Sequence, residues 1–318
     1  MLVRILDAIE TFIDRLGSVD PLPLSLAIGC HLLKMGCTAM AWRNALAAAY
    51  PGSVVRWRSI YGAYLAGVGV NAIAPARAGD AVRIVLAHRA IADSTYTTVI
   101  SSTAVLALFD ATVAGLLLAW AIATGTLPGL EVLSTLEGFD FAWLLSRPLL
   151  FQLLVSALLL ALVLVAVWAR GHVANLGQRI GQGFRILRPP RRYLGRVALW
   201  QAADWVLRLA TIAFLLRAFD IPLSLERVLL VQVSQSLATL LPVTPAGIGT
   251  EQALLVVLLS GAAPASVLLA FSVGAKITLT ITNVVAGFAA LALTLRTVRY
   301  SRVLERQVSA AEEPRDSA

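Results

Sequence analysis

Long apolar stretches alternate with short polar segments along this chain of 318 residues. Runs at about 22–42, 95–123, 148–168, 197–219 and 265–295 are long enough to cross a hydrocarbon core of about 30 Å as helices. Because lipid supplies no hydrogen-bond partners, each crossing segment must satisfy its own backbone, and a helix does so. The pattern therefore predicts an all-α integral membrane protein built as a helical bundle.

Two shorter apolar runs end at prolines. The run at about 60–74 stops at Pro75, and the run at about 228–241 stops at Pro242. Proline lacks a backbone donor and the glycines that follow permit sharp turns, so a helix ends at each point. Irregular backbone at membrane depth persists only where it is buried or lines a wet cavity. We expect two broken, re-entrant-like hairpins, with re-entrant and fully spanning forms both open.

The order of elements repeats along the chain. A span, a broken hairpin and a long span occupy about 21–125, and the same three occupy about 196–297. A linking span at about 148–168 lies between them and reverses the direction of the second half. Corresponding breaks in two inverted halves point to the binding site in many transporters. The sequence thus predicts one transmembrane domain over 21–300.

Composition and charge support this class and add an orientation. The chain is 58% hydrophobic and 14% charged, with a mean hydropathy of +0.81. The net charge is +8, and the arginine-rich loop at 170–196 predicts a cytoplasmic loop and C-terminus, with a specific head-group site as the alternative. No soluble basic domain is present, so we do not expect nucleic-acid binding. Residues 1–20 have the pattern of an amphipathic interfacial helix, and residues 301–318 form a polar tail.

The first polar motif follows Pro75 and contains Arg77, Gly79, Asp80 and Arg83. If a helix restarts here, Asp80 lies near its N-terminus, where a carboxylate suits the helix dipole, and Arg83 is one turn away. We expect these residues to contact a lipid head group. The alternative is a short interfacial loop held by an Asp–Arg pair.

The second polar motif contains Thr244, Pro245, Gly247, Gly249 and Glu251. Free N–H groups at a restarting helix can bind a phosphate or a carboxylate. Aligning Gly79 with Gly247 sets Arg83 opposite Glu251, which makes both motifs candidate substrate-binding segments. The alternative is an ordinary turn with Glu251 as a capping charge.

Four charged residues interrupt the long apolar runs: Asp110, Asp204, Arg208 and Lys276. Each costs about 2.5–3.5 kcal/mol at a helix centre in lipid, so we expect them to face one another, the motifs or water. Asp204 and Arg208 are four residues apart on one helical face and are expected to pair. Asp110 and Lys276, one from each long run, are a second candidate pair. Lys34, by contrast, is expected to snorkel toward an interface.

Residues 71–83 and 241–251 resemble the two signatures of the lysylphosphatidylglycerol synthase transmembrane-region family, also called the flippase-like family. The resemblance covers about residues 20–297, although family members often carry an arginine where this chain has Lys276. It implies a bacterial inner-membrane protein of lipid translocation. In the aminoacyl-phosphatidylglycerol enzymes this region is fused to a soluble transferase domain, which we do not find in this chain, so we do not expect lysyl transfer.

The leading hypothesis is therefore a flippase or scramblase that moves a phospholipid or isoprenoid-type lipid through a polar midplane cavity. Its partner is a membrane lipid, whether anionic, aminoacylated or isoprenoid. A non-catalytic membrane partner of a lipid- or envelope-modifying enzyme is the alternative, and an intramembrane enzyme using Asp80 and Glu251 is a third. No hydrolase, ATPase or metal-site signature occurs, so neither a metal nor a cofactor is expected.

Overall fold

The computed structural model describes residues 19–74, 77–124, 178–240 and 250–312. These residues fold into helices, and none of them belongs to a strand. The principal helices in chain order are α2 (Pro21–Ala49), α3 (Trp57–Ile73), α4 (Ala78–Ala90), α5 (Tyr96–Ala123), α10 (Leu199–Ala218), α11 (Leu225–Leu240), α12 (Thr250–Leu258) and α13 (Ala265–Glu312). The predicted all-α class is confirmed, and α13 continues into the polar tail at 301–318.

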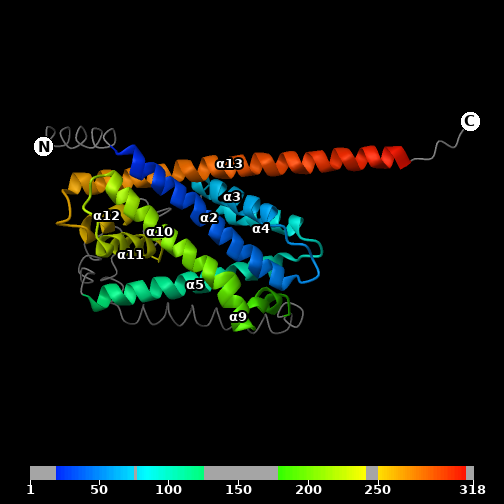
Figure 1. The fold of residues 1–318 in the computed structure, drawn as a ribbon, viewed down its shortest axis with the longest axis horizontal. Coiled ribbons are helices and arrows are strands. Elements are labelled where there is room, and N and C mark those ends of the chain that lie inside the picture. Colours follow the sequence, from blue (N-terminus) through cyan, green and yellow to red (C-terminus); the bar gives the residue numbers. More distant parts are fainter. Residues whose placement is uncertain (1–18, 75–76, 125–177, 241–249, 313–318) are drawn as a thin grey trace, which may run out of the picture.

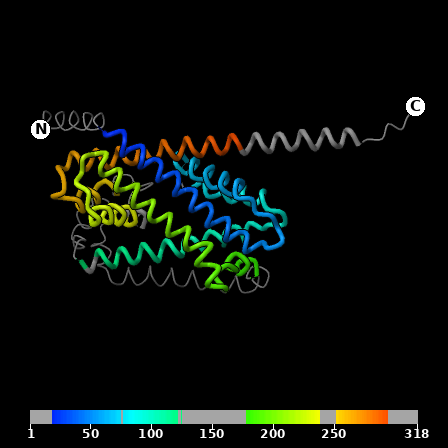
Figure 2. Tube along the Cα trace, in the orientation of Figure 1, coloured from blue at the N-terminus to red at the C-terminus, as the bar shows by residue number. Residues whose placement is uncertain are grey.

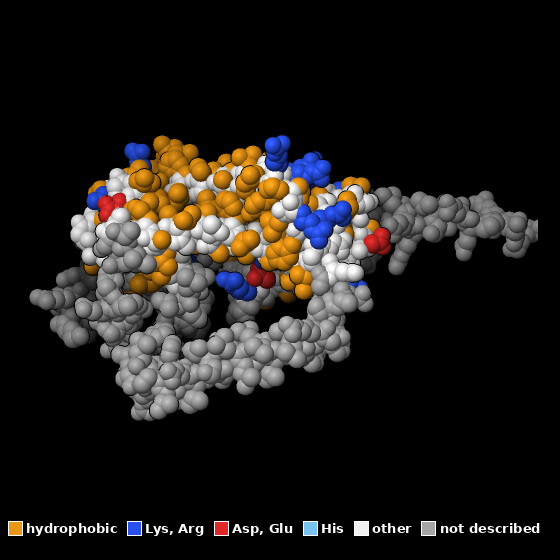
Figure 3. Space-filling view, turned by 90° about the horizontal axis from the view of Figure 1, so that it is seen from below, with side chains coloured by type: hydrophobic (Ala, Val, Ile, Leu, Met, Phe, Trp, Pro, Cys, Tyr) orange, Lys and Arg blue, Asp and Glu red, His pale blue; other side chains and the backbone are white. Residues whose placement is uncertain are grey.

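Four helical segments of the described chain are long and apolar enough to cross a membrane, namely Pro21–Ala49, Tyr96–Ala121, Pro190–Ala218 and Ala265–Leu293. They correspond to four of the five long runs of the sequence. Figure 3 shows hydrophobic side chains spread over the described surface, with Lys and Arg side chains confined to a few patches. Apolar side chains over much of one face are typical of a protein that faces lipid. The linking span at 148–168 and the interfacial helix up to residue 18 lie outside the described residues.

The helices α2 and α10 cross the centre of the molecule side by side and run in opposite directions (Figures 1 and 2). At one end the backbone N–H of Asp20 donates to the carbonyl of Ala218 at 3.1 Å. At the other end the Asn44 side-chain amide donates to the carbonyl of Arg196 at 2.7 Å. The first helices of the two halves are therefore antiparallel partners.

The remaining helix contacts also correspond between the two halves of the chain. Helix α3 packs on α13 of the other half, and α11 packs on α5 in return. Helix α4 packs on α3 and α5, just as α12 packs on α11 and α13. Close approach of α3 and α13 depends on glycine, because a Cβ added at Gly69 would lie 2.7 Å from Cα of Gly287. Matching order, matching neighbours and opposite direction are the features that an inverted repeat requires.

The interior has two main apolar clusters separated by a polar layer. One cluster gathers around Leu216, Leu268 and Phe271. The other gathers around Trp42 and Ile60. Helix α2 contributes Ala27 to the first and Ala41 to the second, and between these positions it carries His31, Lys34 and Thr38. The polar groups therefore lie near the middle of the helix rather than at its ends.

The part of the predicted basic loop that the structure describes, 178–196, is helical rather than irregular. It contains η1 (Arg185–Leu187), α9 (Pro190–Tyr193) and η2 (Leu194–Ala198), which lead directly into α10. Gln182 donates to the carbonyl of Ala49 at 2.9 Å, and Ile186 is buried in the second apolar cluster. The arginines of this described segment are exposed, as expected for a solvated loop, and these two anchors fix the segment against the bundle.

Candidate functional site

The first motif forms the break between α3 and α4. Arg77 has a φ of 57° and precedes the first residue of α4. The following Gly79 is buried directly against the Gly67 carbonyl, where no Cβ would fit. The Asn71 side chain accepts from the Gly79 N–H at 2.8 Å and donates to Asp80 at 3.0 Å. Asn71 therefore caps the restarting helix, a role that the sequence analysis did not assign to it.

Two of the three charged residues of this motif pair with each other. Asp80 pairs with Arg83 at 3.3 Å, and both side chains are about a quarter to a third exposed, at 32% and 26%. The Arg83 guanidinium lies 5.8 Å from the ring centroid of Trp42, which donates to Ser102 at 3.0 Å. This pair at the start of α4 is the local geometry predicted from the sequence, which both interpretations of the motif share.

An ion pair on α10 is joined to α2 by a hydrogen bond in the polar layer. Asp204 is almost fully buried, with 2% of its side chain exposed, and pairs with Arg208 at 2.9 Å, as predicted. The hydroxyl of Thr38 donates to the other carboxylate oxygen of Asp204 at 2.6 Å. Arg208 also lies over the ring of Trp205 at 4.7 Å. The carboxylate thus has donors from both central helices, which offsets its burial.

The predicted pair between Asp110 and Lys276 is wrong. Lys276 pairs with Glu251 at 2.9 Å, across α13 and α12. Asp110 instead accepts from the indole N–H of Trp205 at 2.9 Å and from the amide of Gln201 at 3.4 Å. Equivalent positions in the two halves had suggested a contact between them, but the nearer partners of both residues come from the second half.

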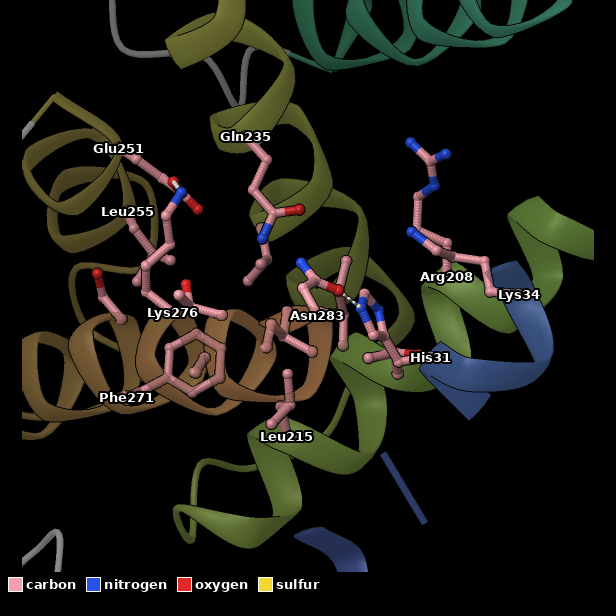
Figure 4. Close-up of a pocket in the computed structure, with 17 residues that line it drawn as sticks. His31, Lys34, Arg208, Leu215, Gln235, Glu251, Leu255, Phe271, Lys276 and Asn283 are labelled. Carbon is pink, nitrogen blue, oxygen red and sulfur yellow. Dashed lines mark hydrogen bonds and ion pairs between the residues drawn. The ribbon is translucent and has the colours of Figure 1, made fainter. Parts of the chain in front are cut away.

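A cavity of about 300 Å³ opens beside this polar layer (Figure 4). It is formed by residues of α2, α10, α11, α12 and α13. Figure 4 shows Glu251 and Lys276 on one side and Arg208 with Lys34 on the other, with Gln235 between them. The Nε2 atom of His31 and the Oδ1 atom of Asn283 are 2.8 Å apart at its edge.

The wall of the cavity is half polar and half apolar. Ile212, Leu215, Leu255, Phe271 and Leu279 form its apolar part. Two buried polar atoms in lining residues, the Oγ atom of Ser272 and the Nε atom of Arg208, have no hydrogen-bond partner among the described residues. A wall with charged side chains on one part and apolar side chains on another suits an amphiphilic ligand.

The structure brings together some predicted site residues and separates others. Arg208, Glu251 and Lys276 line the cavity. The residues of the first motif, Arg77, Gly79, Asp80 and Arg83, do not line it, and neither do Asp110 and Asp204. Thr244, Pro245, Gly247 and Gly249 lie outside the described residues.

Sequence reasoning missed Lys34 as a member of the site. It lies 13 residues after Pro21 and 15 before Ala49, at the middle of α2, roughly 20 Å from either end at 1.5 Å per residue. That distance is too long for a lysine to snorkel, and its central position in the run was the available signal. No cluster of three His, Cys, Asp or Glu side chains that could hold a metal ion occurs among the described residues.

The helical fold and its long apolar segments place this chain in the class of polytopic α-helical membrane proteins. Residues 2–287 match the profile of the lysylphosphatidylglycerol synthase TM region, so this chain belongs to that family. The family relates to lipid handling, which agrees with the resemblance of both polar motifs. The searches of curated proteins and of solved structures returned no match.

Proposed function

We propose that the protein translocates a lipid across the bacterial inner membrane, with the cavity beside α2 and α10 as the polar step on the path. The observation that carries the proposal is the position of this cavity. Lys34, Arg208 and Lys276 all lie away from the ends of helical segments long enough to span the bilayer. A head group crossing about 30 Å of hydrocarbon needs polar contacts at that depth.

The chemistry of the wall supports the same role. Polar side chains face one part of the cavity and leucine, isoleucine and phenylalanine face another. A lipid has the same division, with a hydrated head and apolar tails. Lys34 comes from the first half of the chain, whereas the other charged lining residues come from the second. A relative movement of the halves would therefore change access to the cavity, as in alternating-access transporters.

The proposal assigns binding and passage to the chain and no bond-making step. Gradients or a partner protein would have to supply energy for uphill movement, because the sequence has no phosphate-binding loop for ATP. The orientation with the basic segment and the C-terminus in the cytoplasm follows from the arginine distribution and belongs to the proposal.

The test is reconstitution of the purified protein in liposomes with a fluorescent lipid in both leaflets. A quencher added outside reports the fraction that reaches the outer leaflet. We expect a labelled anionic lipid to cross faster than in protein-free vesicles. The double variant Asp204→Asn with Arg208→Gln should slow the crossing, because it removes the charge pair beside the cavity without stranding either partner.

The matched control is Arg217→Gln. Arg217 is exposed on the same helix as Arg208 and does not line the cavity. This substitution replaces arginine with glutamine, as at Arg208, and should leave the crossing rate unaltered. If wild-type protein moves no anionic, zwitterionic, aminoacylated or isoprenoid lipid faster than empty vesicles, the translocase proposal fails.

A further inference from the structure

Both lysines of the chain line the same cavity. The sequence has lysine only at positions 34 and 276, and all its other basic side chains of fixed charge are arginines. These two residues are far apart in the sequence and come from different halves, yet both belong to the cavity wall. Arg208 adds a third cation. The cavity therefore collects positive charge from three separate helices.

The wall itself has fewer carboxylates than cations. Arg208 is paired with Asp204, and Lys276 is paired with Glu251, which is the one carboxylate in the wall among the described residues. No described carboxylate lies within ion-pair distance of Lys34. A cation at mid-membrane depth is costly unless an anion or water faces it. Asp204 and Asp110 act on Lys34 only from beyond ion-pair distance, so its ammonium group is left to pair with an anionic occupant.

The exposed fractions of Lys276 and Glu251 indicate how a doubly charged phosphate group could be held. Glu251 is 16% exposed, whereas Lys276 is 45% exposed. A phosphate oxygen can therefore reach the ammonium group of Lys276 without displacing buried side chains. Phosphate oxygens bind well to such charged donors.

Resting on the proposed function, we propose that the cavity selects a lipid whose head group is a small phosphate anion without a cationic substituent. Phosphatidic acid and isoprenyl phosphates have this chemistry. A lysylated head group carries two amines, which would meet Lys34, Arg208 and Lys276 at close range. Like charges in a confined site repel, so the cavity disfavours the aminoacylated lipid after which the family is named.

The size of the cavity agrees with a small head group. A volume of about 300 Å³ corresponds to roughly ten water molecules at 30 Å³ each and lies at the lower end for ligand pockets. The apolar residues Leu215, Leu255 and Phe271 in the wall distinguish a lipid from free phosphate. They provide contact for the first part of an acyl or isoprenyl chain and nothing for inorganic phosphate.

The two lysines also provide the assay. An amine-selective acylating reagent modifies Lys34, Lys276 and the α-amino group of the expressed chain, and peptide mass spectrometry separates the three. The α-amino group serves as the reference for reagent consumed by the lipid. The purified protein in detergent is labelled with dioleoyl phosphatidic acid, phosphatidylcholine, lysylphosphatidylglycerol or glycerol 3-phosphate at equal concentration.

We expect phosphatidic acid to slow labelling of both lysines severalfold relative to the α-amino group, and the other three compounds to leave it unchanged. Equal protection by lysylphosphatidylglycerol would overturn the charge argument. Equal protection by glycerol 3-phosphate would assign the site to a free phosphate compound instead of a lipid. Absence of protection by phosphatidic acid would also overturn the inference.

Variants give an independent measurement by native mass spectrometry of bound phosphatidic acid. Lys34→Met and Lys276→Met should each weaken binding about tenfold, the effect of one charged hydrogen bond, whereas Arg217→Gln should not. Binding without crossing in liposomes would leave this inference intact and refute the translocase. Crossing of lipids without protection of the lysines would refute this inference alone.

Discussion

The hydrogen bond between the two central helices allows a quantitative prediction for Thr38→Val. The Thr38 hydroxyl donates to Asp204 at 2.6 Å, and that carboxylate is 2% exposed. Valine has nearly the same shape but no donor. Because the unfolded chain stays in detergent or lipid, the added methyl group gains little from burial. The loss should therefore reflect the hydrogen bonds of this hydroxyl, which also contacts the Lys34 carbonyl and Tyr64.

The magnitude follows from the depth and charge of this bond. Interhelical hydrogen bonds in membranes average about 0.6 kcal/mol, with a maximum near 1.7 kcal/mol. This one is short and has a charged acceptor, which places it at the upper end. We expect Thr38→Val to lower the free energy of unfolding by about 1.5 kcal/mol. Reversible unfolding by sodium dodecyl sulfate in mixed micelles, followed by tryptophan fluorescence, measures it.

Thr112→Val is the matched control. Thr112 is exposed on α5, and its hydroxyl donates only to the carbonyl of Leu108 one turn earlier. Its loss should cost less than about 0.5 kcal/mol. A double-mutant cycle of Thr38→Val with Asp204→Asn should recover most of the effect as coupling. If Thr38→Val and Thr112→Val are equally mild, the polar layer does not join α2 to α10 in the way described.

Three further variants test other contacts by the same unfolding assay. Gly79→Ala should be strongly destabilising, by more than about 2 kcal/mol, because a Cβ there meets the Gly67 carbonyl and the Asn71 side chain; a mild effect would contradict the close approach of α3 and α4. Asn71→Ala should cost about 1 kcal/mol through loss of the cap on α4, and an unchanged free energy of unfolding would count against that role. Glu251→Gln and Lys276→Met should couple in a double-mutant cycle, whereas Asp110→Asn and Lys276→Met should add independently; coupling of the second pair would restore the partner assignment that the structure contradicts.

Helix positions followed closely from the sequence because the bilayer leaves few alternatives. The run at 197–219 became α10, and the break at Pro75 falls directly after α3 ends at Ile73. Ion pairs between residues close in the sequence could be predicted equally well. Asp204 and Arg208 are four residues apart, so helical geometry alone brings them together.

Contacts between distant helices were harder to infer. Asp110 and Lys276 occupy similar places in the two halves, and a sequence alignment gives no rotation of either helix about its axis. The structure turns Asp110 toward Trp205 and Lys276 toward Glu251. Asn71 was overlooked for a related reason, since its amide reaches over the break to Gly79 and Asp80. That contact depends on the fold of the turn, which the spacing of residues does not specify.

The position of Lys34 connects the energetic and functional arguments. A lysine at the centre of a spanning helix costs about 2.5–3.5 kcal/mol, and this chain carries Arg208 and Lys276 beside the same cavity. If these cations served structure alone, each would be expected to have a buried carboxylate, as Arg208 has in Asp204. Lys34 lacks such a partner among the described residues and faces a cavity with apolar residues on its other wall. A lysine without an ion pair in that position suits a negatively charged head group that arrives with its own apolar chains.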